Sequence, residues 1–188
     1  MENNNQNNNQ NNNQNNNQNN NQNNNQNNNQ NNKEYSIQII KFKNCNKDLR
    51  LKLLNTFFTC FNNSMDPCFY DETIIKILYY GKNIAGMICG IDNYELLKFN
   101  SEDSYYIKYD KKGMFIYNLC INEKHRKKGF GKILLKLFIN KYSKVVDYFH
   151  TQIFKNNIAS RFIFTSQNFV ENKKLKDKYE NEFSVFYK

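Results

Sequence analysis

The chain has 188 residues, a formal net charge of +10 at pH 7, and 39% hydrophobic residues. No run approaches the ~18 consecutive apolar residues of a membrane span, and the amino terminus lacks the basic start, apolar block and cleavage site of a secretory signal. These features argue against a membrane protein and predict an intracellular one, cytoplasmic or nuclear, with no membrane partner.

The amino-terminal segment is a near-perfect repeat of Asn-Asn-Asn-Gln from Asn3 to Asn32. It has no apolar side chains to bury, so it cannot offset the entropy lost on ordering. We therefore predict a disordered low-complexity tail at residues 1–32 and one domain at residues 33–188, which is long enough for one core. Asn/Gln-rich tracts can self-associate as β-aggregates, but a tolerated expansion is the simpler interpretation.

The first half of the domain shows strand and helix periodicities in turn. Asn62-Asn63-Ser64 breaks the helical pattern, and Asp66-Pro67 marks a turn or a new helix entry. The predicted elements are a strand at 35–42, a helix at 47–61, and a hairpin of strands 74–80 and 84–91 around a turn at 81–83. Residues 93–112 are predicted to be a loop or an extended hairpin arm.

The second half continues with a strand, a basic loop and a helix. The predicted elements are a strand at 114–121, a helix with its apolar stripe at 134–142, a strand at 145–154, a helix entered at Asn157 and ending near Asn168, and a strand at 182–187. This order predicts an α/β fold with a mixed sheet and helices on its faces.

The loop between strand 114–121 and the following helix has the features of an anion site. The first N–H groups of a helix lack intrahelical partners, and the helix dipole adds positive potential there. Gly129 and Gly131 have no Cβ to hold a ligand away. Further positive charge comes from Arg126, Lys127, Lys128 and Lys132. The pattern predicts a bound phosphate group, most simply a pyrophosphate.

The glycine spacing distinguishes between phosphate-binding motifs. A P-loop needs four residues between its glycines, and G-x-G-x-x-G would need glycine at Leu134. Arg126-x-x-Gly129-x-Gly131 instead resembles the acetyl-CoA signature Q/R-x-x-G-x-G/A of the GNAT superfamily of N-acetyltransferases. Residues 157–169 are similar to that family's second signature, and the resemblance covers about 35–187. It implies a GNAT-like acyl-CoA N-acyltransferase fold: a central, mostly antiparallel sheet with helices on both faces.

The resemblance also implies where acetyl-CoA, the co-substrate, would bind. Backbone N–H groups at the end of strand 114–121 would hold the pantetheine arm, and those of the loop would hold the pyrophosphate. The implied cofactor-binding residues are Leu119, Cys120, Ile121, Arg126, Lys127, Lys128, Gly129, Phe130, Gly131, Lys132 and Asn157.

The resemblance implies acetyl transfer to a primary amine by direct attack in a ternary complex. The acceptor, a small molecule or a protein N-terminus or lysine, is not readable from the sequence. Strand 114–121 contains no acid, so the candidate catalytic residues are Glu123 beyond the strand, Tyr117 as a water-orienting group, and Ser160. Ser160 would replace the tyrosine hydroxyl that many family members have where this chain has Phe164.

Other residues are weaker candidates for these roles. Asn118 could help orient a water, and Asp71 or Glu72 could reach in from the second-helix region. His125 has a suitable unperturbed pKa of about 6.5, but it stands where the family usually has an aromatic packing residue.

Two alternatives to an active enzyme follow from the same residues. The absent strand acid and Phe164 favour a catalytically weak or inactive module of this fold that binds acyl-CoA or a protein partner. The basic charge suits nucleic acid, but the lysines are spread along the chain and no recognition motif occurs, so nucleic acid is not a predicted partner.

The cysteines predict neither a metal nor a disulfide framework. Cys45, Cys60, Cys68, Cys89 and Cys120 are odd in number and have no metal-site spacing. Most lie in apolar segments, where free cysteine packs as a small hydrophobic residue. With His125 and His150 as the only histidines, no zinc site is predicted.

Overall fold

The computed structural model describes residues 35–61, 69–98, 111–176 and 182–188. The predicted tail at residues 1–32 lies outside these ranges. The described residues belong to one compact unit, Tyr35–Lys188. No helix in the described ranges is long and apolar enough to cross a membrane.

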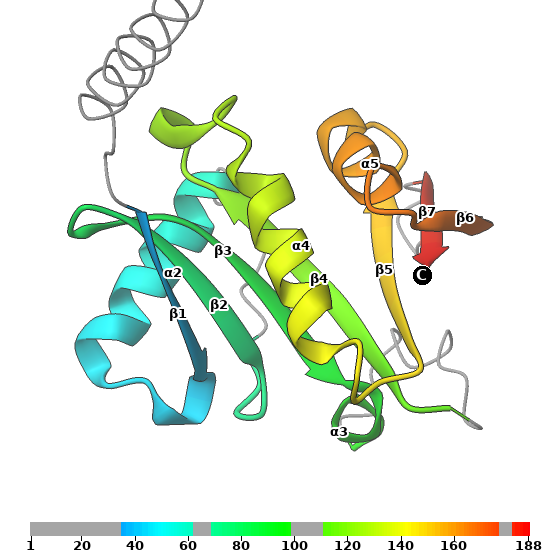
Figure 1. The fold of residues 1–188 in the computed structure, drawn as a ribbon, viewed down its shortest axis with the longest axis horizontal. Coiled ribbons are helices and arrows are strands. Elements are labelled where there is room, and N and C mark those ends of the chain that lie inside the picture. The colour runs from blue at the N-terminus through cyan, green and yellow to red at the C-terminus, as the bar shows by residue number, and fades with distance from the viewer. Residues whose placement is uncertain (1–34, 62–68, 99–110, 177–181) are drawn as a thin grey trace, which may run out of the picture. The chain divides into compact units, whose positions relative to one another are not determined.

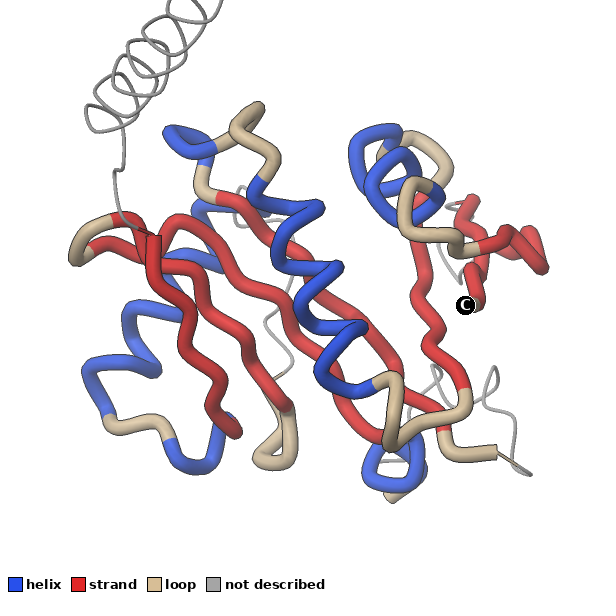
Figure 2. Tube along the Cα trace, in the orientation of Figure 1, coloured by secondary structure: helices blue, strands red, loops and turns tan. Residues whose placement is uncertain are grey.

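The elements follow the predicted alternation of strands and helices, as Figures 1 and 2 show. The strands are β1 (Tyr35–Lys41), β2 (Ile74–Tyr80), β3 (Asn83–Asp92), β4 (Gly113–Ile121), β5 (Tyr148–Phe154), β6 (Val170–Lys176) and β7 (Glu182–Tyr187). The helices are α2 (Lys47–Phe61), α3 (Asn93–Leu97), α4 (Phe130–Tyr142) and α5 (Ile158–Thr165), with 3-10 turns η1 (Phe42–Asn44) and η3 (Glu123–His125).

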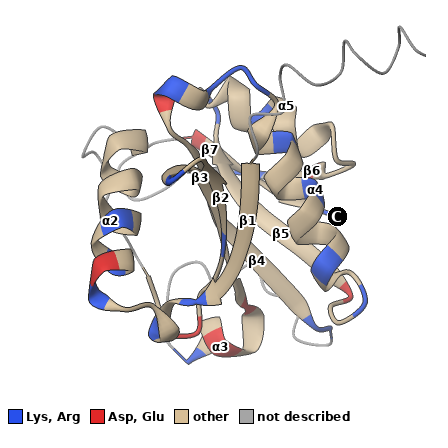
Figure 3. Ribbon diagram, turned by 60° about the vertical axis from the view of Figure 1, so that its left-hand side comes forward, with Lys and Arg blue, Asp and Glu red and all other residues tan. Residues whose placement is uncertain are grey.

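The strands form a seven-stranded sheet in the order β1-β2-β3-β4-β5-β7-β6. Neighbours pair antiparallel except β4 and β5, which are parallel. A parallel pair needs a crossover, and α4 supplies it. Helix α2 lies on one side of the sheet, and α4 and α5 on the other (Figure 3). The predicted mostly antiparallel sheet with helices on both faces is confirmed.

Each face of the sheet has its own core. On the α4 face, Leu134, Leu135 and Phe138 are fully buried against the strands. On the α2 face, Leu53 and Phe57 are buried in the same way. Burying one such side chain stabilises the fold by about 1.5–3 kcal/mol. The helical periodicities read from the sequence therefore mark the packed stripes.

Three local elements differ from the sequence-based prediction. Strand β6 was not predicted, because its sequence VENKKLK is polar and it pairs only with β7 at the sheet edge, where burial imposes no alternation. Helix α3 was not predicted either; the Asp92 carboxylate accepts from the Tyr94 N–H at 2.8 Å and caps it. Strand β5 begins at Tyr148 rather than at 145, because Val145 lies in the turn after α4 and is 60% exposed.

The cysteines are the clearest correction to the sequence analysis. Cys60 and Cys120 form a disulfide with their Cα atoms 5.9 Å apart, whereas most of the cysteines were expected to be free hydrophobic residues. The bond joins residues 60 positions apart, and packing of α2 on β4 brings them together, which no local spacing could show. Cys45 and Cys89 are free and buried, as expected.

Candidate active site

The site begins where β4 and β5 stop pairing. Their parallel register covers Gly113–Phe115 of β4 and Tyr148–His150 of β5, and beyond it the strands separate (Figure 1). The last third of β4, ending in Leu119–Ile121, therefore faces a gap toward β5. Backbone groups at such a divergence are available to a ligand, as at the carboxyl ends of other parallel strands.

A β-bulge lies in β4 just before this segment. The β3–β4 register shifts between Cys89, which pairs with Asn118, and Gly90, which pairs with Ile116, so Tyr117 is the extra residue. Bulges re-aim side chains and occur often beside active sites. Beyond the bulge, Leu119 packs toward the α4 core and Cys120 toward the α2 core.

The loop between β4 and α4 has the geometry of an anion site. It passes through η3 and reaches the helix at Gly129, whose φ of 78° is left-handed and favours glycine. A Cβ at Gly129 would meet no atom within 4 Å, so the space beside this residue is open to a ligand. Figure 2 shows the loop as the link between the two elements.

Glycine occupies position 131 for a different structural reason, which is helix packing. A Cβ there would lie 2.9 Å from Ile163 Cδ1, so the missing side chain lets α4 and α5 approach each other. Close approach of these helices brings the start of α5 beside the loop. Asn157 caps that start, its side-chain oxygen accepting from the Ser160 N–H at 3.1 Å.

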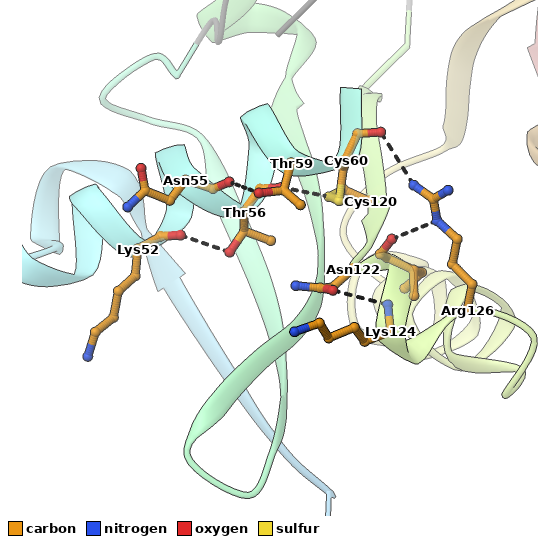
Figure 4. Close-up of a disulfide and its surroundings, with 10 residues drawn as sticks. Lys52, Asn55, Thr56, Thr59, Cys60, Cys120, Asn122, Lys124 and Arg126 are labelled. Atoms are coloured by element: carbon orange, nitrogen blue, oxygen red, sulfur yellow. Dashed lines mark hydrogen bonds between the residues drawn. A yellow bond between two sulfur atoms is a disulfide. The ribbon is translucent and has the colours of Figure 1, made fainter. Parts of the chain in front are cut away.

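The basic side chains are arranged unequally around the loop. Lys127 and Lys132 line the cavity, and Lys132 Nζ lies 4.7 Å from the Phe162 ring centre. Lys128 instead lies over the Tyr80 ring at 5.2 Å. Arg126 donates from Nε to the Ile121 carbonyl at 3.2 Å and from Nη2 to the Cys60 carbonyl at 3.5 Å (Figure 4). Arg126 therefore ties the loop to β4 and α2.

These elements enclose a cavity of about 590 Å³. Its wall combines the end of β4, the glycine loop, the start of α5 and the last turn of α2. The predicted cofactor-binding residues that line it are Leu119, Cys120, Ile121, Arg126, Lys127, Gly129, Phe130, Gly131, Lys132 and Asn157. Lys128 is the predicted cofactor residue that does not line it.

The three catalytic candidates lie in different places. Ser160 is half-buried in the cavity wall. Tyr117 packs on the α2 and α3 face, where its hydroxyl is 2.6 Å from Thr73 Oγ1. Glu123 is exposed in η3 and is not part of the cavity wall. Phe164, at the family's tyrosine position, is 3% exposed and packs edge-on against Phe169 in the α4 core.

The weaker candidates Glu72 and His125 both contact other side chains, although His125 also lines the cavity. Glu72 pairs with Lys41 and Lys43 at 2.5 Å each, and hydrogen bonds from both hold its pKa at about 2, so it is a poor proton acceptor. His125 packs near Tyr80, and burial, followed by the charges of lysines 128 and 124, lowers its pKa. Its packing role was the sequence-based expectation.

His150 is a buried polar residue that the sequence analysis considered only as a metal ligand. It stands at the last β4–β5 pair, opposite Phe115, with their rings stacked at 4.8 Å. Its Nε2 is 2.8 Å from Asn93 Oδ1, and Asn93 Nδ2 donates to the Tyr148 hydroxyl at 2.7 Å. Only the sheet register reveals this position. In the described residues, no group of three or more His, Cys, Asp or Glu could hold a metal.

Comparison with known proteins adds a family and a fold. The profile described as Acetyltransferase (GNAT) family matches residues 46–169. No curated protein sequence matches the chain.

Several solved structures are similar in fold. The NatC complex bound to Gag peptide and CoA is 14% identical, with a TM-score of 0.62, covering 82% of this chain and 97% of that one. Arabidopsis thaliana NAA60 with acetyl-CoA is 14% identical, with a TM-score of 0.59 and 82% and 98% covered. Arabidopsis thaliana Naa50 with the bisubstrate analogue CoA-Ac-MVNAL is 18% identical, with a TM-score of 0.55 and 82% and 97% covered.

Proposed function

The chain belongs to the GNAT family of acetyltransferases, and on that premise we propose that it transfers an acetyl group from acetyl-CoA to a primary amine by direct attack in a ternary complex. The observation that carries the proposal is the cavity in which the end of β4, paired with β3 but not with β5, meets the amino terminus of α4. Acetyl-CoA supplies the activated acyl thioester. The protein's task is then to hold both reactants and to stabilise charge.

The glycine loop fits the pyrophosphate of acetyl-CoA. The N–H groups at the start of α4, from Phe130 to Lys132, lack intrahelical partners and point along the positive end of the helix dipole. Gly129 leaves the approach open, and Lys127 and Lys132 add charge at the cavity wall. Arg126 acts by holding the loop rather than as a free charge.

The end of β4 fits the pantetheine arm and the reacting carbonyl. In the proposed complex, backbone N–H groups of Leu119–Ile121 bind the arm in the gap toward β5, and one of them stabilises the oxyanion. Backbone donors of this kind tolerate any side chain, so the role is compatible with the disulfide at Cys120. Removing one oxyanion donor typically lowers kcat by about 10²–10³-fold.

Proton transfer needs a donor for the departing thiolate. We assign this role to Ser160, which lines the cavity, because Phe164 offers no hydroxyl and is buried in the core. Tyr117 remains the proposed water-orienting group on the opposite face, where its hydroxyl already contacts Thr73. Glu123 is exposed and outside the cavity wall, so it would act only through water.

The lack of a carboxylate base in the described cavity wall favours an α-amine over a lysine as the acceptor. Among the described residues of its wall there is no Asp or Glu, and the pKa of the one histidine, His125, is lowered by burial. At pH 7.4 roughly a quarter of α-amines with a pKa of about 7.8 are neutral, against about one lysine in a thousand. Acetylation of an α-amine therefore needs a weaker base than acetylation of a lysine. The peptide in the NatC structure and the peptide-containing analogue in the Naa50 structure support a peptide N-terminus.

A peptide assay tests this proposal. The full chain is incubated with acetyl-CoA and a peptide that has a free N-terminus and an internal lysine, and mass spectrometry locates the acetyl group. A matched peptide with a blocked N-terminus is the control. We expect acetylation at the α-amine and none on the control; modification at lysine alone would contradict the acceptor assignment.

The alternative function is a module of this fold that binds acyl-CoA without turnover. Phe164 favours it, because its buried ring supplies no acid. The two functions separate in one experiment: acetyl-CoA binding without acetylation of any peptide supports the module. A folded chain that does not bind acetyl-CoA contradicts both.

A further inference from the structure

The Cys60–Cys120 disulfide lies in the wall of the cavity assigned to acetyl-CoA. Both cysteines line that cavity, Cys60 from the last turn of α2 and Cys120 from the end of β4 (Figure 4). We propose that this cross-link makes the site redox-sensitive: the cavity binds acetyl-CoA tightly while the bond is intact and more weakly once it is reduced. The inference rests on the proposed acetyl-CoA site.

The cross-link is the only covalent anchor between the last turn of α2 and β4. Two weaker contacts support the same turn. Arg126 Nη2 donates to the Cys60 carbonyl at 3.5 Å, and Cys60 and Phe61 pack against the α2 core. Cys60 itself is half-buried. Reduction removes the covalent bond and leaves this last turn of the helix attached to β4 by noncovalent contacts, so local opening costs less.

Arg126 connects this turn of α2 to the phosphate loop. Its guanidinium contacts the Cys60 carbonyl and, through Nε, the Ile121 carbonyl at 3.2 Å. Movement of the α2 turn withdraws one of these acceptors. Arg126 is thus a positioning residue through which the state of the disulfide reaches Gly129 and the start of α4.

The remaining described thiols do not compete in exchange reactions. Cys45 and Cys89 are buried, and burial raises the pKa of both thiols. The thiolate is the reactive form, so thiols with a raised pKa are inert near neutral pH. A reductant therefore acts in the described structure on one bond, between the Cys60 and Cys120 sulfurs.

A dithiol can reduce the Cys60–Cys120 bond by itself. One dithiol sulfur attacks a sulfur of the Cys60–Cys120 bond, the mixed disulfide is resolved by the second dithiol sulfur, and the reductant closes into a cyclic disulfide. Its two protons end on the Cys60 and Cys120 thiols. Two electrons pass to the protein, and no other reactant is needed.

Linkage makes the effect reciprocal. If the intact bond favours acetyl-CoA binding by some factor, bound acetyl-CoA must favour the intact bond over the dithiol by the same factor. Saturating acetyl-CoA is therefore expected to shift the equilibrium with a dithiol buffer toward the disulfide. This readout needs no catalysis.

The test is acetyl-CoA affinity of the full chain, measured by calorimetry before and after reduction. Tris(2-carboxyethyl)phosphine is used, because it has no thiol that could take the acetyl group and is itself oxidised to the phosphine oxide with oxygen from water. We expect about a tenfold weaker affinity, in the range typical of coupled sites. The Cys60→Ser/Cys120→Ser double variant should bind weakly in both conditions, and Cys45→Ala should keep the full response.

Three results would overturn the inference. One is equal affinity in both redox states, and another is purified unreduced protein with every cysteine titrating as a thiol. The third is loss of binding that coincides with loss of the folded circular-dichroism signal, because the bond would then only maintain the fold. Absence of binding by the folded, oxidised chain would instead remove the proposed acetyl-CoA site.

Discussion

The polar groups on the two faces of the sheet are arranged in different ways. On the α4 side, the cavity depends largely on backbone: the start of a helix, a left-handed Gly129 and the end of β4, which lacks a partner on its β5 side. On the α2 face, the polar groups near the divergence are side chains already bonded to one another, such as Tyr117 with Thr73 and His150 with Asn93. A backbone site is specified by a short local motif, whereas a side-chain site depends on segments far apart in the chain.

The largest expected effect comes from Gly129→Glu on the backbone-built face. A glutamate at this φ of 78° is strained and places bulk and negative charge where the pyrophosphate would lie. Acetyl-CoA binding should fall below detection by calorimetry. Gly81→Glu is the matched control, since Gly81 also has a positive φ of 62° and an open Cβ position, but lies in the β2–β3 turn. Equal loss in both variants would mean that strain, not the site, is responsible.

The cross-link between α2 and β4, on the α2 face, is expected to have the next largest effect. Removing it in the Cys60→Ser/Cys120→Ser variant should lower the free energy of unfolding by about 2–4 kcal/mol, because the unfolded chain gains the freedom of a long loop. Denaturant unfolding under non-reducing conditions measures this difference. Reductant should lower the stability of the parent to that of the variant and leave the variant unchanged; a parent insensitive to reductant would argue that the bond does not form in solution.

A substitution at Ser160 tests the proposed proton donor in the cavity wall. If its hydroxyl supplies the proton, Ser160→Ala should lower kcat by about 100-fold and leave the affinity for acetyl-CoA unchanged. Ser166→Ala is the control, since that hydroxyl donates to the Ile163 carbonyl at the exposed end of α5. Full turnover by Ser160→Ala would remove the assignment.

The smallest expected effect concerns Lys76, buried beneath α4. Its Nζ donates to the Leu137 carbonyl at 2.5 Å, and burial, followed by the charge of Lys141, lowers its pKa to about 8. The unfolded chain therefore binds the proton more tightly, and stability should rise by roughly 1–3 kcal/mol as the pH increases from about 8 to about 10.5. Lys76→Met should abolish this rise relative to the parent, measured by denaturant unfolding at several pH values. A rise of the same size in Lys76→Met would assign it to other groups.

The sequence predicted the backbone-built face best. The strand at 114–121, the glycine loop and the helix after it depend on local periodicity and spacing, and the structure has all three. Most of the predicted cofactor residues line one cavity. Lys128 does not, because its position on the loop directs it toward Tyr80. Motif spacing places the backbone, but it does not fix where a long side chain points.

Other features could not be predicted from the sequence because they depend on tertiary contacts. The disulfide joins two elements that meet only when α2 packs on β4. Strand β6 has no hydrophobic alternation and exists as a strand through its pairing with β7. The bulge at Tyr117 places that side chain on the face opposite Ser160, and the sequence of the strand does not show this bulge.

Hydrogen exchange with and without acetyl-CoA tests the central claim most directly. Mass spectrometry of the full chain would locate the backbone amides that a bound ligand protects. We predict protection concentrated at residues 119–121, at 126–133 and at the start of α5, with β6 and β7 unchanged. Protection confined to other segments, or none at saturating acetyl-CoA, would contradict the assignment of this cavity as the acetyl-CoA site.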